Sequence, residues 1–184
     1  LGVNVMCGRL KYFGFLSDYA NHYYGLLNQN GEQLSVKYDS TIMRDIPYTI
    51  DNIDLMYATY MQRLKETAER EQRMKYTVVG VHRDDLLFSM DNMNARDFAS
   101  QGQVRSIAIA LKLAEAKMIF EKSGDLPVMI LDDVLSELDA YRRSFIINHI
   151  DKLQTFITSC NMSDMDKVSD GAVWNVEKGS FSRV

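Results

Sequence analysis

The sequence predicts an α/β protein: a mostly parallel sheet with flanking helices, preceded by a helical or α+β segment. Short apolar runs of the kind found in buried strands alternate with segments of helical periodicity along the second half of the chain. One such run, VMILDD, ends in two adjacent carboxylates, and ligand sites of α/β sheets lie at the carboxyl ends of strands. Two long segments of helical pattern dominate the first third of the chain.

The composition is that of an ordinary globular protein, with 46% apolar and 25% charged residues among 184. No apolar run approaches the roughly 20 residues of a membrane span, and the start of the chain lacks a signal-peptide pattern. Cys7 and Cys160 stand in no metal-binding spacing, which suits a reducing cytoplasm. The net charge of −4 does not indicate nucleic-acid binding, although a local basic face is compatible with it. We therefore expect a cytoplasmic protein with no membrane partner. Because position 1 is not Met, we also consider that the chain is a fragment.

The first 75 residues are expected to be mainly helical. Residues 10–27 have a helical pattern rich in aromatic side chains, and the Asn30-Gly31 pair after them suits a turn. LSVKY (residues 34–38) alternates like a strand. Residues 53–74 predict a charged helix, because Glu and Arg residues pair four positions apart in the favourable order. We expect those charges to form a solvated face rather than a DNA contact.

The pattern changes near Tyr76. YTVVGV (residues 76–81) and LLFSM (residues 86–90) predict two strands on either side of the polar HRDD. Residues 100–120 predict a long helix. Four charged residues on it or just after it fall within a sector of roughly 100°: Arg105, Lys112, Glu115 and Lys122. The rest of that helix is apolar over much of its circumference, so we expect protein to cover it. A Gly and a Pro in KSGDLP end the helix.

A strand, a helix, a strand and a hairpin complete the chain. VMILD (residues 128–132) and TFITS (residues 155–159) suit buried, parallel strands, and residues 140–150 predict a helix between them. The last 14 residues, GAVWNVEKGSFSRV, predict a hairpin that turns at Lys178-Gly179.

Asp132 and Asp133 are the first candidate site. At the end of a buried strand, one carboxylate can hold Mg²⁺ while the metal bridges phosphate oxygens. The neighbouring carboxylate can orient or deprotonate an attacking water. The alternative is that either carboxylate caps a turn or the next helix, and the pattern alone leaves this open.

SQGQVR, which begins at Ser100, is the second candidate site. A hydroxyl, a Gly that lets the backbone approach a phosphate, and the free N–H groups of a helix start form an anion site. The alternative is an ordinary helix start in which Ser100 is the N-cap. Asp139, downstream of the carboxylates, could likewise cap the next helix.

Four segments carry a family resemblance: GVHRDDLLF, FASQGQVRSIAIALKLAEA, MILDDVLSELDAYRR and QTFITS. In this order and spacing they resemble the C-terminal half of the RecF family of bacterial DNA replication and repair proteins. That family belongs to the ATP-binding-cassette ATPases of the chromosome-maintenance type. The motifs lie within residues 76–160, and the earlier part matches by pattern only. The resemblance implies that residues 1–75 are part of the second, arm-like lobe. It implies that residues 76–184 are the C-terminal part of the ATPase head.

The resemblance also implies a role for each candidate residue. Asp132 matches the Walker B aspartate that supports Mg²⁺, and Asp133 takes the catalytic position. Asp139 ends the D-loop, which begins at Ser136 and crosses the dimer interface, so we expect it near the nucleotide. The signature motif, which contacts the γ-phosphate of ATP bound to the opposite subunit, matches Ser100, Gln101, Gly102 and Gln103.

The chain departs from the family pattern in two places. Val81 replaces the Pro of the family's GPHRDD motif. Thr158 and Ser159 stand where many relatives carry a switch His, which leaves the γ-phosphate sensor unidentified. His82 and Arg83 are expected either in a structural salt bridge or facing the nucleotide or the lobe interface.

The resemblance implies a function for the intact protein. ATP binding would close a homodimer of heads on DNA at single-strand gaps or junctions, and hydrolysis would open it. The implied setting is recombinational repair, replication-gap recovery and the SOS response, with recombination mediators of the RecF pathway as partners. No GxxxxGK[ST] loop occurs in these 184 residues, so we expect it upstream in a weakly active ATPase and expect this chain alone to be inactive.

Two other classes of function stay open on the sequence. A metal-dependent nuclease or phosphohydrolase could use a carboxylate cluster made of Asp84, Asp85, Asp132 and Asp133. A non-catalytic interaction fragment would need none of these groups.

Overall fold

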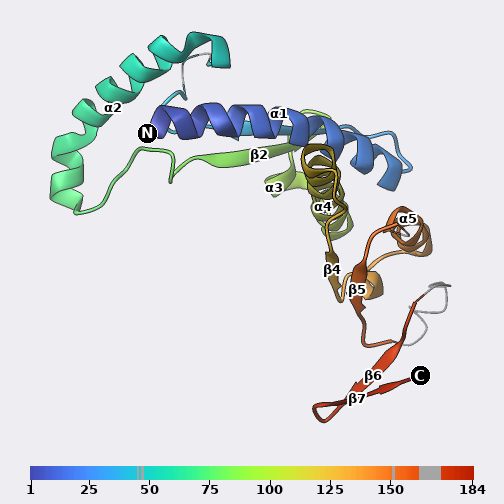
Figure 1. The fold of residues 1–184 in the computed structure, drawn as a ribbon. Coiled ribbons are helices and arrows are strands. Elements are labelled where there is room, and N and C mark those ends of the chain that lie inside the picture. Colours follow the sequence, from blue (N-terminus) through green and yellow to red (C-terminus); the bar gives the residue numbers. More distant parts are fainter. Residues whose placement is uncertain (45, 47, 151, 162–170) are drawn as a thin grey trace. The chain divides into compact units, whose positions relative to one another are not determined.

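The computed structural model describes residues 1–184 except 45, 47, 151 and 162–170 (Figure 1). The chain forms two compact units, residues 1–124 and residues 125–184, which we describe one at a time. The expected loop around Pro47 lies partly outside the described residues. Among the described helices, none combines the length and the apolar character that crossing a membrane requires.

The first unit combines long helices with a small antiparallel sheet. Its sheet has the order β1-β2-β3, and β1 pairs with β2 from Leu34 opposite Met90 to Asp39 opposite Asp85. Helix α1 packs against both α4 and β1. In chain order the elements are α1 (Gly2–Leu27), β1 (Leu34–Asp39), the 3-10 turn η1 (Ile50–Asn52), α2 (Ile53–Met74), β2 (Asp85–Met90), β3 (Met93–Asn94), α3 (Ala95–Phe98) and α4 (Gln101–Ser123).

A core at the N-terminal end of α1 explains why this helix begins earlier than the pattern predicts. Val3 and Met6 are buried there with residues from β1, the loop after it and α2: Tyr38, Ile42, Met43 and Met56. Gly2 and Gly8 are poor helix formers, so the sequence pattern does not predict a helix at this end. Burial of the apolar side chains stabilises the helix there instead.

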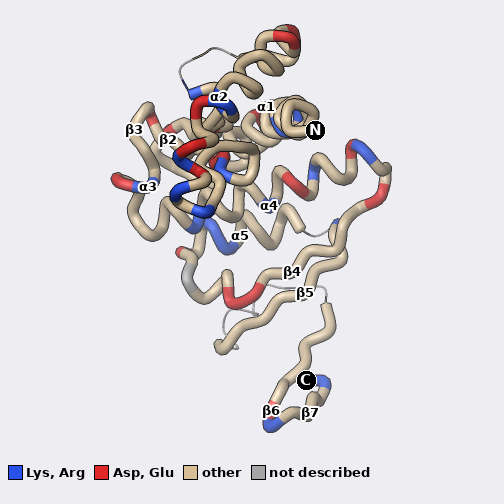
Figure 2. The backbone as a smooth tube through the Cα atoms, turned by 90° about the vertical axis from the view of Figure 1, so that its left-hand side faces the viewer, with Lys and Arg blue, Asp and Glu red and all other residues tan. Residues whose placement is uncertain are grey.

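Helix α2 matches the predicted residues 53–74. Its only buried residues among those described are Met56 and Thr59, and basic and acidic segments alternate along it (Figure 2). Most charged side chains of α2 are exposed, as a solvated surface requires, and the absence of a DNA contact there stays a prediction.

The strand expected at residues 76–81 is absent, and this prediction is wrong. Backbone N–H groups that a ladder would use are bound locally, because the Glu71 carboxylate accepts from Val78 at 2.7 Å. The Arg83 N–H donates to the carbonyl of Gly80, which has a φ of +133°, so the chain turns here. The apolar, β-branched run thus predicts a buried strand that side-chain bonding and a tight turn prevent.

The second unit contains the parallel pairing that the fold class requires. Strand β4 (Met129–Asp132) pairs in parallel with β5 (Thr155–Thr158), while β6 (Trp174–Glu177) and β7 (Ser180–Arg183) form an antiparallel hairpin. The hairpin turns at Lys178-Gly179, both with positive φ, as predicted. Between the parallel strands lie the 3-10 turn η2 (Leu135–Glu137) and helix α5 (Ala140–Ile150), the latter with its predicted bounds.

The fold class is therefore confirmed, with two differences in detail. In the part of the chain that is described, only β4 and β5 pair in parallel; the other two sheets are antiparallel. Strand β4 is not buried on both faces as expected, because Leu131 is 6% exposed whereas Ile130 is 72% exposed. The expected boundary after residue 75 does not coincide with the compact units, since β1 and β2 pair across it, and it stays a prediction about lobes of the intact protein.

Candidate functional site

The carboxyl end of β4 brings Asp132, Asp133 and Thr158 together. Asp132 is the last residue of β4 and lies opposite Thr158 of β5, whose hydroxyl donates to Asp132 Oδ1 at 2.5 Å. The N–H of Asp133 donates to the carbonyl of Thr158 at 3.2 Å and to its hydroxyl at 3.0 Å. Thr158 therefore fixes both the side chain of Asp132 and the backbone of Asp133.

Asp133 turns the chain sharply at the end of the strand. Its φ of +51° lies in the left-handed region, which Asp tolerates better than most residues with a side chain. Ser136 stabilises the turn, because its hydroxyl lies 2.8 Å from Asp133 Oδ1 and 3.0 Å from the Asp133 carbonyl oxygen. Neither carboxylate caps a helix, since η2 has no side-chain cap and α5 is capped by another residue. The alternative of a carboxylate that caps a turn holds for Asp133, which accepts from Ser136. Both carboxylates are exposed at the end of β4, where the sequence predicts them.

Ser100 begins helix α4 with a complete capping box. Its hydroxyl accepts from the N–H of Gln103 at 3.3 Å, and Gln103 Oε1 accepts from the N–H of Ser100 at 2.8 Å. The cap thus uses only one of the first N–H groups, and those of Gln101 and Gly102 have no acceptor within the helix. A Cβ added at Gly102 would meet nothing within 4 Å, so the backbone there is open to close approach. The cap and the anion site predicted from the sequence are therefore compatible.

Asp139 is the N-cap of α5. Its Oδ1 accepts from the N–H of Arg142 at 2.8 Å, and its other oxygen pairs with the guanidinium of the same residue. The backbone hydrogen bond from Arg142 is the main cause that lowers the pKa of Asp139 below its usual range. The capping role that the sequence left open is thus confirmed, while nucleotide contact by Asp139 stays a prediction.

The GVHRDD segment forms a structural cluster that the sequence does not reveal. The side chain of Asp84 is 0% exposed and lies 3.7 Å from the guanidinium of Arg9 in α1. Its oxygens accept from the N–H and the hydroxyl of Thr41, at 2.8 and 3.0 Å, and from the hydroxyl of Tyr38. Burial, and next the hydrogen bond to Asp84, raise the pKa of Tyr38. Asp84 thus fastens the segment after α2 to α1, β1 and the loop that follows β1.

His82 and Arg83 make local contacts. A ring nitrogen of His82 lies 2.7 Å from the hydroxyl of Thr77, and Arg83 Nε donates to the Thr77 carbonyl at 3.1 Å. The Arg83 guanidinium also lies over the ring of Tyr76, 5.4 Å from its centre.

Asp84 is poorly suited to the metal cluster of the nuclease interpretation, because its side chain is buried and bound by other residues of the first unit. Within the described ranges, no group of three or more His, Cys, Asp or Glu side chains is placed to hold a metal ion.

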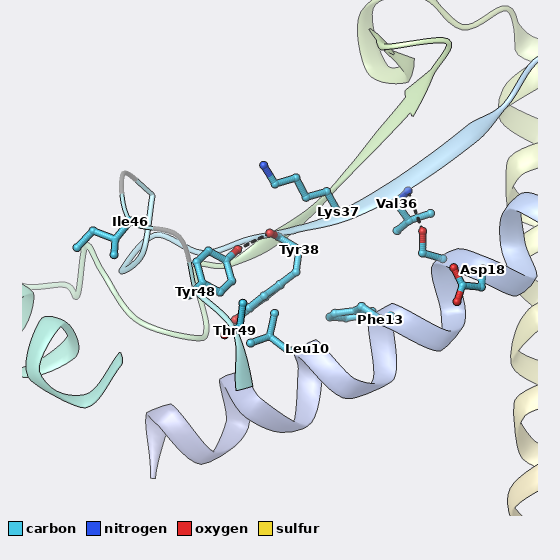
Figure 3. Close-up of a pocket in the computed structure, with 11 residues that line it drawn as sticks. Leu10, Phe13, Asp18, Val36, Lys37, Tyr38, Ile46, Tyr48 and Thr49 are labelled. Atoms are coloured by element: carbon cyan, nitrogen blue, oxygen red, sulfur yellow. Dashed lines mark hydrogen bonds between the residues drawn. The ribbon is translucent and has the colours of Figure 1, made fainter. Parts of the chain in front are cut away.

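A separate pocket of about 800 Å³ lies between α1 and β1 (Figure 3). Its wall is mainly aromatic and apolar, and the hydroxyl of Tyr48 donates to the carbonyl of Tyr38 within it. None of the predicted site residues lines this pocket; its lining includes Leu10, Phe13, Val36, Tyr38, Ile46 and Tyr48.

Comparison with known proteins identifies relatives along the whole chain, although no protein-family model matches it. DNA replication and repair protein RecF of Lactobacillus gasseri is 35% identical over 185 residues, which cover 99% of this chain and 49% of that protein. RecF of Listeria welshimeri is 36% identical over 186 residues, covering 100% of this chain and 49% of that protein. The chain spans about half the length of the curated relatives it matches.

Solved structures show the same relationship. A structure described as the recombination mediator protein RecF-ATP in the RecFOR pathway has a TM-score of 0.80 at 25% identity, covering 100% of this chain and 47% of that one. A structure described as RecF-ATPrS in that pathway has a TM-score of 0.80 at 27% identity, and it too covers 100% of this chain and 47% of that one. An SMC ATPase matches at a TM-score of 0.54 and 12% identity, covering 99% of this chain and 88% of that one, which shows the fold alone.

The fold is thus part of the α/β fold of ATP-binding-cassette ATPases. Within this class the resemblance to the RecF family is confirmed, and the chain matches the C-terminal portion of a RecF protein.

Proposed function

We propose that this chain supplies the Walker B carboxylates and the signature motif of a RecF-type DNA-repair ATPase. The observation that carries the proposal is the end of β4, where two exposed carboxylates follow a parallel strand and are held by Thr158. The left-handed backbone of Asp133 supports it further, because such conformations in residues with side chains concentrate at functional sites. In the proposed arrangement, residues 1–75 belong to the arm-like lobe and residues 76–184 to the head.

The carboxylates fit the roles that the family implies. Thr158 occupies one oxygen of Asp132, which leaves Oδ2 for a hard cation that prefers carboxylate ligands. Bound Mg²⁺ would neutralise charge on the phosphates of ATP. Asp133, held through Oδ1 by Ser136, would orient the attacking water and accept its proton.

The start of α4 fits recognition of nucleotide held by the partner head. Ser100 uses its hydroxyl oxygen as an acceptor in the cap, so its proton remains available to a phosphate oxygen. The N–H groups of Gln101 and Gly102 would add two further donors at the positive end of the helix dipole. Closing two heads on ATP would therefore require this helix start to be open, as Gly102 makes it.

The proposed biological role follows the relatives. ATP-driven dimerisation would clamp DNA at gaps and junctions, and hydrolysis would release it, in recombinational repair, replication-gap recovery and the SOS response in the cytoplasm. A neighbour described as a recombination mediator protein in the RecFOR pathway supports other proteins of such a pathway as partners.

Mixing two full-length variants tests the trans arrangement. Ser100→Arg should leave ATP binding by the monomer nearly intact but block dimerisation, because a bulky side chain prevents close approach to the partner's nucleotide. Mixed with a protein that lacks the Walker A Lys, it can form one intact composite site, from its own nucleotide pocket and the partner's signature. We expect ATPase activity to reappear on mixing. If mixing restores none while both proteins stay folded and able to associate, Ser100 does not act in trans.

A further inference from the structure

A carboxylate outside every motif holds the signature helix start in place. Glu32 lies in the turn between α1 and β1, and its two oxygens lie 3.0 and 3.1 Å from Nε2 of Gln103. The same carboxylate accepts from the hydroxyl of Tyr24 at 3.0 Å and from the side-chain amide of Asn28 at 3.1 Å. Tyr24 and Asn28 are both buried, so Glu32 is itself anchored to the end of α1.

Glu32 decides which way the Gln103 amide faces. A carboxylate can only accept hydrogen bonds, so the NH₂ end of the amide must point toward Glu32. Oε1 then points the other way, where it accepts from the N–H of Ser100 at 2.8 Å. With both ends of the amide bound, the capping box and the position of Ser100 follow from a residue on another element.

We infer that Glu32 is a positioning residue for the signature motif in ATP-driven dimerisation, acting through Gln103. The inference rests on the proposed function. Without Glu32 the amide of Gln103 is free to rotate, and the hydroxyl of Ser100 and the first N–H groups of α4 lose their fixed direction. A preorganised donor set binds an anion more tightly than one that must be ordered on binding.

The experiment measures ATP-dependent dimerisation of the full-length protein by sedimentation, alongside ATP binding by the monomer. Glu32→Ala should leave monomer ATP affinity unchanged. It should weaken the dimer about tenfold, because a symmetric dimer contains the change twice and each site loses about threefold. Glu32→Gln retains an acceptor for Gln103 and should recover most of the dimerisation. Gln103→Leu should weaken the dimer similarly, and Glu32→Ala combined with Gln103→Leu should weaken it no further.

Glu121→Ala is the matched control. Glu121 accepts from the hydroxyl of Tyr19 at 2.6 Å and pairs with Lys117 at 3.0 Å, so it too links α1 to α4, but at the far end of the helix. A merely structural role for Glu32 predicts that Glu32→Ala and Glu121→Ala lower the unfolding midpoint alike and leave dimerisation unchanged.

The outcomes separate this inference from the proposed function. Wild-type dimerisation that Ser100→Arg blocks and Glu32→Ala leaves intact would overturn the positioning role alone. A wild-type protein that shows no ATP-dependent dimer would overturn both. If Glu32→Ala does not fold, dimerisation of Gln103→Leu tests the inference instead. Normal ATP-dependent dimerisation of that variant would contradict it.

Discussion

Replacing Asp84 by alanine is expected to destabilise the unit of residues 1–124 by about 3 kcal/mol. The substitution removes three accepted hydrogen bonds and the ionic partner of Arg9, and it leaves the buried hydroxyl of Tyr38 without its acceptor. Hydrogen bonds to a charged group contribute about 1.5–3 kcal/mol each, although they do not add. Breaking a buried ion pair costs about 3–5 kcal/mol. The side chain of Arg9 is 34% exposed and can turn toward water, so we expect the loss of stability to lie at the lower end of this range.

Urea unfolding of the 184-residue chain, followed by far-UV circular dichroism, measures this loss. The signal reports mainly on the first unit, because the long helices α1, α2 and α4 all lie in it. A loss of about 3 kcal/mol is a large part of the roughly 5–15 kcal/mol that stabilises a domain. The midpoint should therefore fall with the slope of the transition unchanged.

Asp85→Ala is the control for this prediction. Asp85 is exposed and lies opposite Asp39 in the β1–β2 pairing, where two like charges face each other. Its removal should change the free energy of unfolding by no more than about 0.5 kcal/mol. If Asp84→Ala costs less than about 1 kcal/mol, or no more than Asp85→Ala, the cluster does not hold the first unit together as described.

Two further predictions concern the second unit. Asp133→Asn in the full-length protein should keep ATP binding and accumulate the closed dimer, with hydrolysis slowed about 100-fold, because Asn tolerates the same left-handed backbone but cannot accept the proton; hydrolysis at the wild-type rate would exclude Asp133 as the water-orienting group. Asp139→Asn should keep the cap of α5 but remove the pH dependence of stability that the Asp139 carboxylate causes. Since the pKa of Asp139 is lowered on folding, its charge stabilises α5 above the usual pKa of about 4 and ceases to do so as pH falls through the lower value. Because Asp139 is exposed, the free energies of unfolding of wild type and variant should differ by only about 0.5 kcal/mol. The unfolding midpoints of both proteins, compared between about pH 5 and 2, measure this difference. Equal pH profiles would contradict the prediction.

The sequence pattern correctly predicts those elements that are stabilised mainly by residues near one another in the chain. Residues 53–74 and 140–150 form helices with the predicted bounds, and the hairpin turns where Lys178-Gly179 permits positive φ. Residues 76–81 have the composition of a buried strand but lack a ladder, because the carboxylate of Glu71 binds their backbone. Strand propensities describe single residue types, so they do not account for a side chain from another segment that binds the backbone.

The candidate site divides in the same way. The position of Asp132 and Asp133 at the end of a strand follows from the apolar run before them, and the cap at Ser100 follows from the Gln three positions later. The contacts of Glu32 with Gln103 and of Asp84 with Arg9 join residues far apart along the chain. Nothing near either residue in the sequence indicates these pairings, since they arise only when α1 packs against its neighbours.

The backbone at Asp133 also bears on which acid can occupy this position. Left-handed φ angles are adopted by Asp and Asn several-fold more readily than by residues with longer side chains, since a short polar group can bond to its own turn, as Asp133 does with Ser136. A Glu here would place its carboxylate one methylene further out and give up that bond to the turn. The choice between Asp and Glu at this position is therefore coupled to the shape of the main chain. An exchange of Asp for Glu would therefore weaken the turn after β4, because it removes the bond to Ser136.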